Sequence, residues 1–103
     1  MIERRRAERI AMKPPANPVS VVGARILDVS PFGMMIESRV AISPDSVIPF
    51  RIVVDGRPSD VSCRVATCRP DKDQRHFGIG LEFLDLDPAA GDHLREVLQR
   101  QTT

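Results

Sequence analysis

Phe77-Gly78-Ile79-Gly80-Leu81-Glu82-Phe83 alternates large apolar residues with glycine and glutamate along its whole length. The segment Val61-Ser62-Cys63-Arg64-Val65-Ala66-Thr67 alternates in the same way, with its more apolar residues at the odd positions. A period of two places successive side chains on opposite faces, which is typical of a half-buried β-strand. These two segments, joined by the polar loop of residues 71–74, predict a mainly β fold.

Earlier segments add further strands to this pattern. Residues 19–29 predict a first strand, a second begins at Met34, and residues 47–54 predict a third. Pro49 cannot donate a backbone hydrogen bond, so we expect it to break or bulge the third strand. Asp55-Gly56 is typical of a tight hairpin turn and predicts that the third and fourth strands are antiparallel neighbours.

The C-terminal segment changes to a helical period. Asp87 is a candidate N-cap, and Pro88 suits the first helical position. A helix over residues 88–100 would carry three apolar residues on one face: Leu94, Val97 and Leu98. Four or five antiparallel strands followed by one helix indicate a small barrel capped by a helix.

Length and composition indicate one soluble domain. The chain has 103 residues and lacks an apolar run long enough to cross a membrane. Its charged N-terminus does not resemble a signal peptide, so we expect a cytoplasmic protein without membrane insertion. Cys63 and Cys68 lie five positions apart in a predicted strand, on opposite faces and about 16 Å apart. We therefore expect reduced cysteines, which fits that compartment.

Charge is concentrated at the N-terminus. The net charge is +1, but five of the 15 Lys and Arg residues lie within the first 13 positions. The proline-rich linker Lys13–Pro18 follows. We expect residues 1–18 to form a basic arm with its linker and residues 19–103 to form the barrel with its helix. A nearly neutral body with four aromatic residues argues against binding of DNA or RNA, and a basic arm suits a small, multiply charged anion.

Two arginines in the arm are spaced for joint binding. Arg5 and Arg9 are four positions apart, so they share a side on either a helix or an extended chain. Guanidinium groups form paired hydrogen bonds to phosphate, and Arg4 adds a third planar cation that can stack on a base. The alternative is a solvated basic terminus without a ligand.

A second motif follows the predicted first strand. Asp28 and Ser30 are two positions apart and project on one face. Ser30-Pro31-Phe32-Gly33 fits a type I turn that would hold both at the barrel rim. Gly33 would let a ligand approach the backbone closely. The alternative is that Asp28 and Ser30 only bind nearby backbone N–H groups and shape the turn.

A guanine nucleotide would use both motifs, because arginine suits phosphate and the guanine O6/N7 edge and a carboxylate suits the guanine N–H groups. The Arg-x-x-x-Arg and Asp-x-Ser-x-x-Gly motifs, together with residues 77–83, resemble PilZ domains, receptors for cyclic di-GMP. The resemblance implies a six-stranded antiparallel β-barrel with a C-terminal α-helix. It also implies that the ligand contacts one set of residues: Arg4, Arg5, Arg9, Asp28, Ser30 and Gly33.

The resemblance carries further expectations about ligand and output. An arginine at the position of Arg4 is associated in the family with an intercalated dimer of cyclic di-GMP. Signalling is expected to pass from the ordered arm to an unidentified effector protein, with no cofactor. The family commonly has Gly-Gly where this chain has Phe32-Gly33, and Phe32 favours type I over type II geometry.

Other functions fit less well. An enzyme is not expected, because the sequence has no nucleophile elbow and no P-loop. No metal site is expected, because His76 and His93 lack a spaced ligand set. Two alternatives remain open: an interaction adaptor that keeps the PilZ fold without binding nucleotide, and a small barrel that binds single-stranded nucleic acid.

Overall fold

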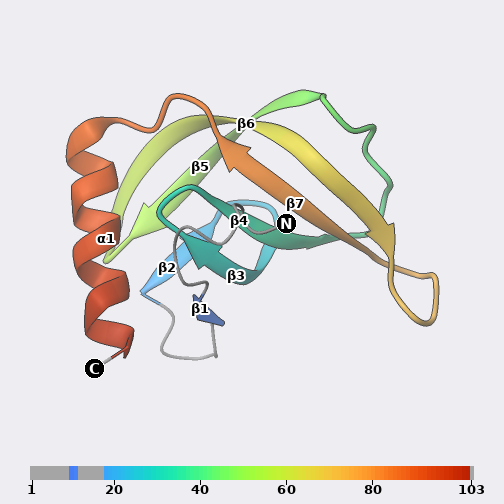
Figure 1. Cartoon of the computed structure of the whole chain (residues 1–103), viewed down its shortest axis with the longest axis horizontal. Helices are drawn as coiled ribbons and strands as arrows, with labels where there is room; N and C mark the ends of the chain where they lie inside the picture. Colours follow the sequence, from blue (N-terminus) through green and yellow to red (C-terminus); the bar gives the residue numbers. More distant parts are fainter. Residues whose placement is uncertain (1–9, 12–17, 103) are drawn as a thin grey trace.

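The computed structural model describes residues 10–11 and 18–102. This part of the chain forms an antiparallel sheet and one C-terminal helix, in the order β1 (Ile10–Ala11), β2 (Val19–Val21), β3 (Arg25–Ser30), β4 (Gly33–Ser38), β5 (Val47–Val54), β6 (Arg57–Pro70), β7 (Phe77–Phe83) and α1 (Pro88–Thr102). The spatial order of the strands is β1-β3-β4-β7-β6-β5-β2 (Figure 1).

The sheet curls into a nearly closed barrel. Six strands remain when the two-residue β1 is set aside, and β3 and β2 stand at the two ends of their order. These two strands are joined by a turn at Val22 and Gly23 and by a bridge between Val21 and Ala24. The six-stranded antiparallel barrel with a C-terminal helix is therefore confirmed.

The core fills the barrel and extends under the helix. Its largest fully buried side chains come from β2 to β7 and from α1: Val19, Val29, Met34, Ile52, Cys63, Val65, Ile79, Leu94 and Val97. In β6, burial alternates from Val61 to Val65 as the sequence predicted, whereas in β7 Gly80 is buried together with its neighbours Ile79 and Leu81. Burial of this apolar surface is the main favourable contribution to folding.

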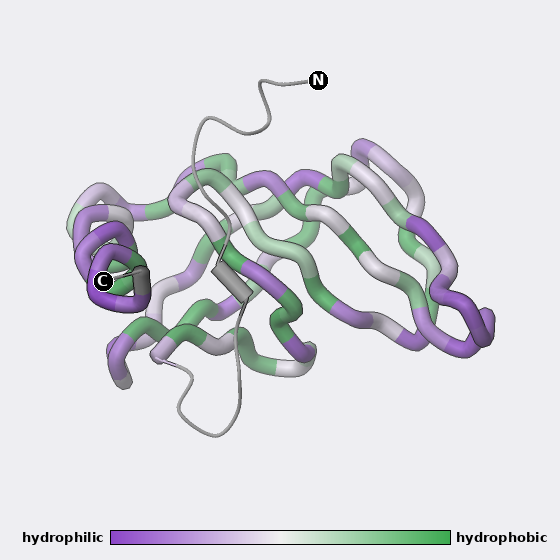
Figure 2. Tube along the Cα trace, turned by 60° about the horizontal axis from the view of Figure 1, so that its bottom comes forward, coloured by the Kyte–Doolittle hydropathy of each residue, from purple (hydrophilic) through white to green (hydrophobic). Residues whose placement is uncertain are grey.

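Helix α1 begins where the sequence predicted. The Asp87 carboxylate accepts hydrogen bonds from the N–H groups of Ala89 at 3.1 Å and Ala90 at 3.4 Å, so Asp87 is the N-cap. Leu94, Val97 and Leu98 are buried against the barrel. The helix stands at one end of the molecule, and the β6–β7 loop is at the other (Figure 1). Figure 2 shows mostly hydrophilic residues at that loop.

The predicted strand over residues 19–29 is wrong as a single element. It is divided into β2 and β3 by the turn at Val22 and Gly23. Gly23 has a φ of 87°, which β-branched residues rarely adopt, and Val22 is 61 % exposed. The register between β3 and β4 shifts between Ile26 and Asp28, which marks an irregularity within β3. The turn allows β2 to leave β3 and pair with β5.

Pro49 does not interrupt β5, contrary to expectation. The register between β5 and β6 runs without a shift, and Pro49 lies opposite Ser62. Pairing with β2 is limited to Ile52–Val54, so Pro49 lies where β5 has one strand neighbour within the described residues. Proline is tolerated there because its missing N–H would point away from the ladder.

Both cysteines are free, as predicted, but they do not lie on opposite faces of a regular strand. The β6 register shifts between Val65 and Thr67, which marks a β-bulge. After this bulge, Cys68 packs against the same core in which Cys63 is buried. Within the described residues, no helix combines the length and apolar character needed to cross a membrane.

Candidate functional site

The β3–β4 turn has the predicted geometry. Ser30 pairs with Gly33 across a two-residue loop, and neither Pro31 nor Phe32 has positive φ, as a type I turn requires. The Ser30 hydroxyl oxygen accepts a hydrogen bond from the Phe32 N–H at 3.2 Å. Ser30 therefore shapes the turn, and only 4 % of its surface is exposed. Phe32 is 47 % exposed and lies outside the core.

Asp28 and Ser30 lie on the outer face of β3. The register from Asp28 to Ser30 is continuous, and Val29 between them is fully buried in the barrel. Successive strand residues point to opposite faces, so Asp28 and Ser30 share the face away from the core. Asp28 is half-buried and pairs with Met35 on one side and Ala11 on the other.

The outer face beside Asp28 is formed by Met35 and two glycines of β7. Met35 pairs with Gly80, and its sulfur would be 3.8 Å from a Cβ atom placed on Gly78. The Met35 methyl group would be 3.8 Å from a Cβ atom on Gly80. Met34 points inward and is fully buried. The pair of adjacent methionines thus divides between core and outer face. The Met35 side chain packs over both glycines, and the Thr67 hydroxyl oxygen would be 2.6 Å from a Cβ atom on Gly80.

Gly33 has a structural reason to be glycine. A Cβ atom at this position would overlap the Leu81 carbonyl oxygen of β7. Gly33 itself is buried and pairs with Glu82. The close approach that the sequence suggested for a ligand is made by a neighbouring strand, and contact of Gly33 with a ligand stays a prediction.

The arginines of the motif, Arg4, Arg5 and Arg9, lie outside the described residues. The strand that follows them does not: in β1, Ile10 pairs with Val29 and Ala11 pairs with Asp28. The chain directly after the arginine motif therefore runs along the outer edge of β3, antiparallel to the segment that carries Asp28.

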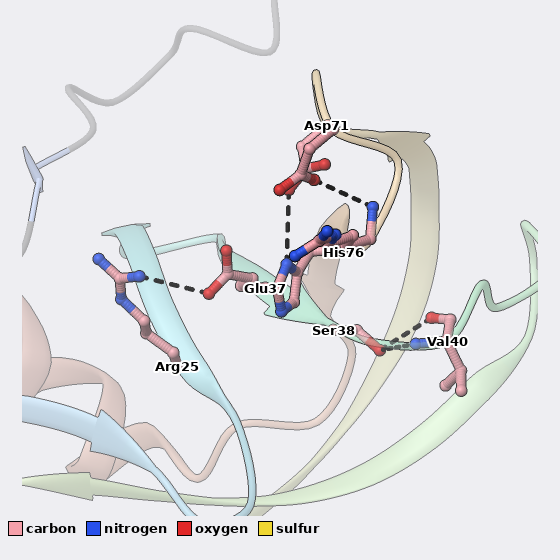
Figure 3. A network of polar contacts seen from close by, with 8 residues as sticks. Arg25, Glu37, Ser38, Val40, Asp71 and His76 are labelled. Atoms are coloured by element: carbon pink, nitrogen blue, oxygen red, sulfur yellow. Dashed lines mark hydrogen bonds and ion pairs between the residues drawn. The ribbon is translucent and has the colours of Figure 1, made fainter.

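A pocket of about 570 Å³ opens at the other end of the β3–β4 hairpin. Its apolar wall includes Ile42, Ile48 and Phe50, and its polar rim includes Glu37 and His76. Glu37 forms an ion pair with Arg25 at 3.3 Å, and His76 Nδ1 lies 3.7 Å from Asp71 Oδ2 (Figure 3).

The sequence did not point to this cluster. Glu37 and Asp71 are far apart in the chain, and the β4–β7 pairing brings them together. The packing of Met35 over Gly78 and Gly80 was also missed. The signal that could have found it is the alternating glycine at these two positions.

The buried cysteine offers no reactive group. Burial and, to a smaller extent, the nearby charge of Asp85 raise the pKa of the Cys63 thiol to about 12. Such a thiol stays protonated at neutral pH and is a poor nucleophile.

Comparison with known proteins agrees with this architecture. A crystal structure of an uncharacterized Legionella protein superposes with a TM-score of 0.63 at 13 % identity, covering 93 % of this chain and 95 % of that one. This likeness shows a shared fold. No curated protein sequence matches the chain significantly. The family model of the PilZ domain matches residues 3–100, which include both motifs and the whole barrel. The chain therefore belongs to the PilZ domain family.

Proposed function

We propose that this PilZ domain is a receptor for cyclic di-GMP, which binds at the outer edge of β3 between the arginine motif and the Asp28–Gly33 segment. PilZ domains are receptor and adaptor domains rather than enzymes, and the family ligand is cyclic di-GMP. We extend this family ligand to the present chain and name the residues that would bind it.

The observation that carries the proposal is the pairing of β1 with β3. Ile10 directly follows Arg9 in the sequence, and Ile10 pairs with Val29, next to Asp28 and Ser30. The covalent distance between consecutive Cα atoms is about 3.8 Å, so the pairing limits how far Arg9 can lie from this edge. The pairing supports a site to which both motifs contribute.

The chemistry of each group suits a part of the ligand. Arg5 and Arg9 would bind phosphate oxygens and the Hoogsteen edge of guanine through paired hydrogen bonds. The Asp28 carboxylate would accept hydrogen bonds from the guanine N1–H and N2–H groups. Ser30 would act with Asp28 on that base, and the Met35 side chain, which pairs with Asp28, would give a guanine ring an apolar contact.

Arg4 would affect the number of ligand molecules that bind to each chain. Its planar guanidinium would stack on a guanine and support an intercalated dimer of cyclic di-GMP. Binding would fix the arm on the barrel and form a surface for a partner protein. The ligand shifts this equilibrium only by its differential affinity for the docked arm.

Isothermal titration calorimetry combined with native mass spectrometry tests the proposal. Cyclic di-GMP should bind, with two ligands per chain if the dimer forms. Arg5→Ala and Arg9→Ala should each weaken binding at least about 10-fold, because a hydrogen bond to a charged group contributes about 1.5–3 kcal/mol. Arg57→Ala, which removes an exposed arginine at the β5–β6 turn, is the matched control and should bind normally.

Two further conditions separate the rival functions. Affinity should fall as salt rises from about 0.05 to 0.5 M, because screening weakens the phosphate contacts. GMP and single-stranded oligonucleotides should bind far more weakly than cyclic di-GMP. Absence of cyclic di-GMP binding to the folded protein would favour the nucleotide-free adaptor, and tighter oligonucleotide binding would favour a nucleic-acid-binding barrel.

A further inference from the structure

Three side chains of types that bind metal ions lie close together beside the pocket. Glu37 comes from β4, and Asp71 and His76 come from the two ends of the β6–β7 loop (Figure 3). One ligand atom of each lies within 4.8 Å of those of the other two. We propose that this cluster binds a divalent transition-metal ion, at a site separate from the cyclic di-GMP site.

Backbone pairing assembles the cluster. In the β4–β7 ladder, Glu37 pairs with Gly78 and Ser38 pairs with Phe77, so Glu37 lies next to the start of β7. The β6–β7 loop is closed by a hydrogen bond from the Asp71 N–H to the His76 carbonyl oxygen at 2.9 Å. Glu37 is thus held in β4, and Asp71 and His76 are held next to the ends of β6 and β7 by the hydrogen bond that closes their loop.

The donor set determines the class of metal. One imidazole nitrogen and two carboxylate oxygens suit borderline ions such as Zn²⁺, Mn²⁺ and Co²⁺ more than Ca²⁺, which prefers oxygen alone. Ligands around such an ion are about 3.0–3.4 Å apart, since metal–ligand bonds are about 2.1 Å. The Asp71–His76 distance of 3.7 Å is close to this value, and side-chain rotation can close the rest of the set.

The charge at the cluster favours a cation. Glu37 and Asp71 approach each other there, and Asp73 adds a third carboxylate beside Asp71. The opposing positive charges are those of Arg25, 3.3 Å from Glu37 Oε1, and of Arg39, which lines the same pocket. Glu37 has a second oxygen that can bind a metal while Arg25 keeps its contact. All three ligand side chains are only 29–38 % exposed, which reduces screening by solvent.

The neighbouring pocket gives the metal open positions. Glu37 and His76 line the pocket of about 570 Å³, and three protein ligands leave at least one coordination position unfilled. Water or a small anionic molecule in the pocket would complete the coordination. The site lies at the opposite end of β3 from Ser30, roughly 17 Å away at 3.3 Å per residue, so metal binding does not depend on cyclic di-GMP.

The test is a titration of the full chain, free of any affinity tag, with ZnCl₂ and MnCl₂ in a calorimeter. One ion per chain should bind. His76→Ala, Glu37→Gln and Asp71→Asn should each lower the affinity at least 10-fold. The matched control is His93→Gln, which changes the other histidine. This control should stay within twofold of the parent.

A second measurement on the unmodified protein avoids variants that fail to fold. In nitrogen-15 NMR spectra of the histidine rings, ZnCl₂ should shift the His76 Nδ1 signal and leave the His93 signals in place. A normal affinity in folded His76→Ala, or an unchanged His76 ring spectrum at saturating zinc, would overturn the proposal. Neither outcome bears on cyclic di-GMP binding, because the two sites share no residue.

Discussion

Gly33→Ala should destabilise the barrel strongly. The added Cβ atom would overlap the Leu81 carbonyl oxygen and come within 3.1 Å of the Leu81 carbonyl carbon and 3.3 Å of the Glu82 Cα. These are backbone atoms of β7, which is paired on both sides, with β4 and with β6, and so cannot move aside. Overpacking a core costs typically 1–3 kcal/mol. We expect about 3 kcal/mol here, because no flexible side chain can absorb the clash.

Urea unfolding followed by circular dichroism measures this loss. Thermal unfolding should show a decrease in Tm on the order of 15 °C for a domain of this size. Gly78→Ala is the matched control from the same strand pair, because its Cβ atom would meet only the Met35 sulfur at 3.8 Å. Its free energy of unfolding should stay within about 1 kcal/mol of the parent.

Equal free energies of unfolding for Gly33→Ala and Gly78→Ala would refute the steric argument. Contact with a ligand would then be the remaining reason for a glycine at position 33. If the expected loss is found, weaker cyclic di-GMP binding by Gly33→Ala reports on folding as much as on recognition. The arginine variants are then the cleaner test of the ligand site.

Asp87→Ala should lower the free energy of unfolding by about 1 kcal/mol, because two N–H groups of α1 lose their acceptor, whereas Asp87→Asn should retain most of it. Equal urea midpoints for the two variants would contradict the N-cap assignment. Stability should fall as pH rises from about 9 towards 12, because the pKa of the Cys63 thiol is about 12 in the fold and 9.0 ordinarily, so the folded state holds the proton longer. Cys63→Ala should flatten this part of the pH profile, and an unchanged slope would show that other groups cause it. Gly56→Ala should cost about 1 kcal/mol, since Gly56 has a φ of 81° in the β5–β6 turn. An unfolding midpoint equal to that of the parent would show that the turn relaxes without strain.

Much of the barrel was predictable because its strands are half-buried. Alternation identified β7 and the first part of β6, and Asp55-Gly56 identified the hairpin between β5 and β6. Positive φ at both Asp55 and Gly56 is the geometry that these residue types favour. In these elements the local preference of the sequence and the tertiary packing agree.

The predictions that were wrong concern features that the local sequence does not indicate. The turn between β2 and β3 contains Val22 and a single glycine, so the apolar pattern continues through it. The bulge after Val65 adds one residue to β6 and cannot be seen from the alternation, because Ala66 and Thr67 fit either face. Long-range pairing decides both features.

The residues of the two candidate sites also differ in how well the sequence predicts their arrangement. Asp28 and Ser30 lie two positions apart on one strand, so their common face follows from the sequence. The cluster of Glu37, Asp71 and His76 depends on the register between β4 and β7, which no local pattern specifies. The same holds for Met35, whose outward direction is fixed only by the pairing of β3 with β4.

Pro49 has a consequence for the behaviour of the domain in a crowded cell. Within the described residues, the first half of β5 has one strand neighbour, and its other edge can template a strand from a second molecule. Proline offers no N–H to such an incoming strand, and its rigid ring obstructs the approach. A residue that disturbs the alternation of β5 thus opposes sheet-to-sheet polymerisation at the seam where the barrel is not fully closed.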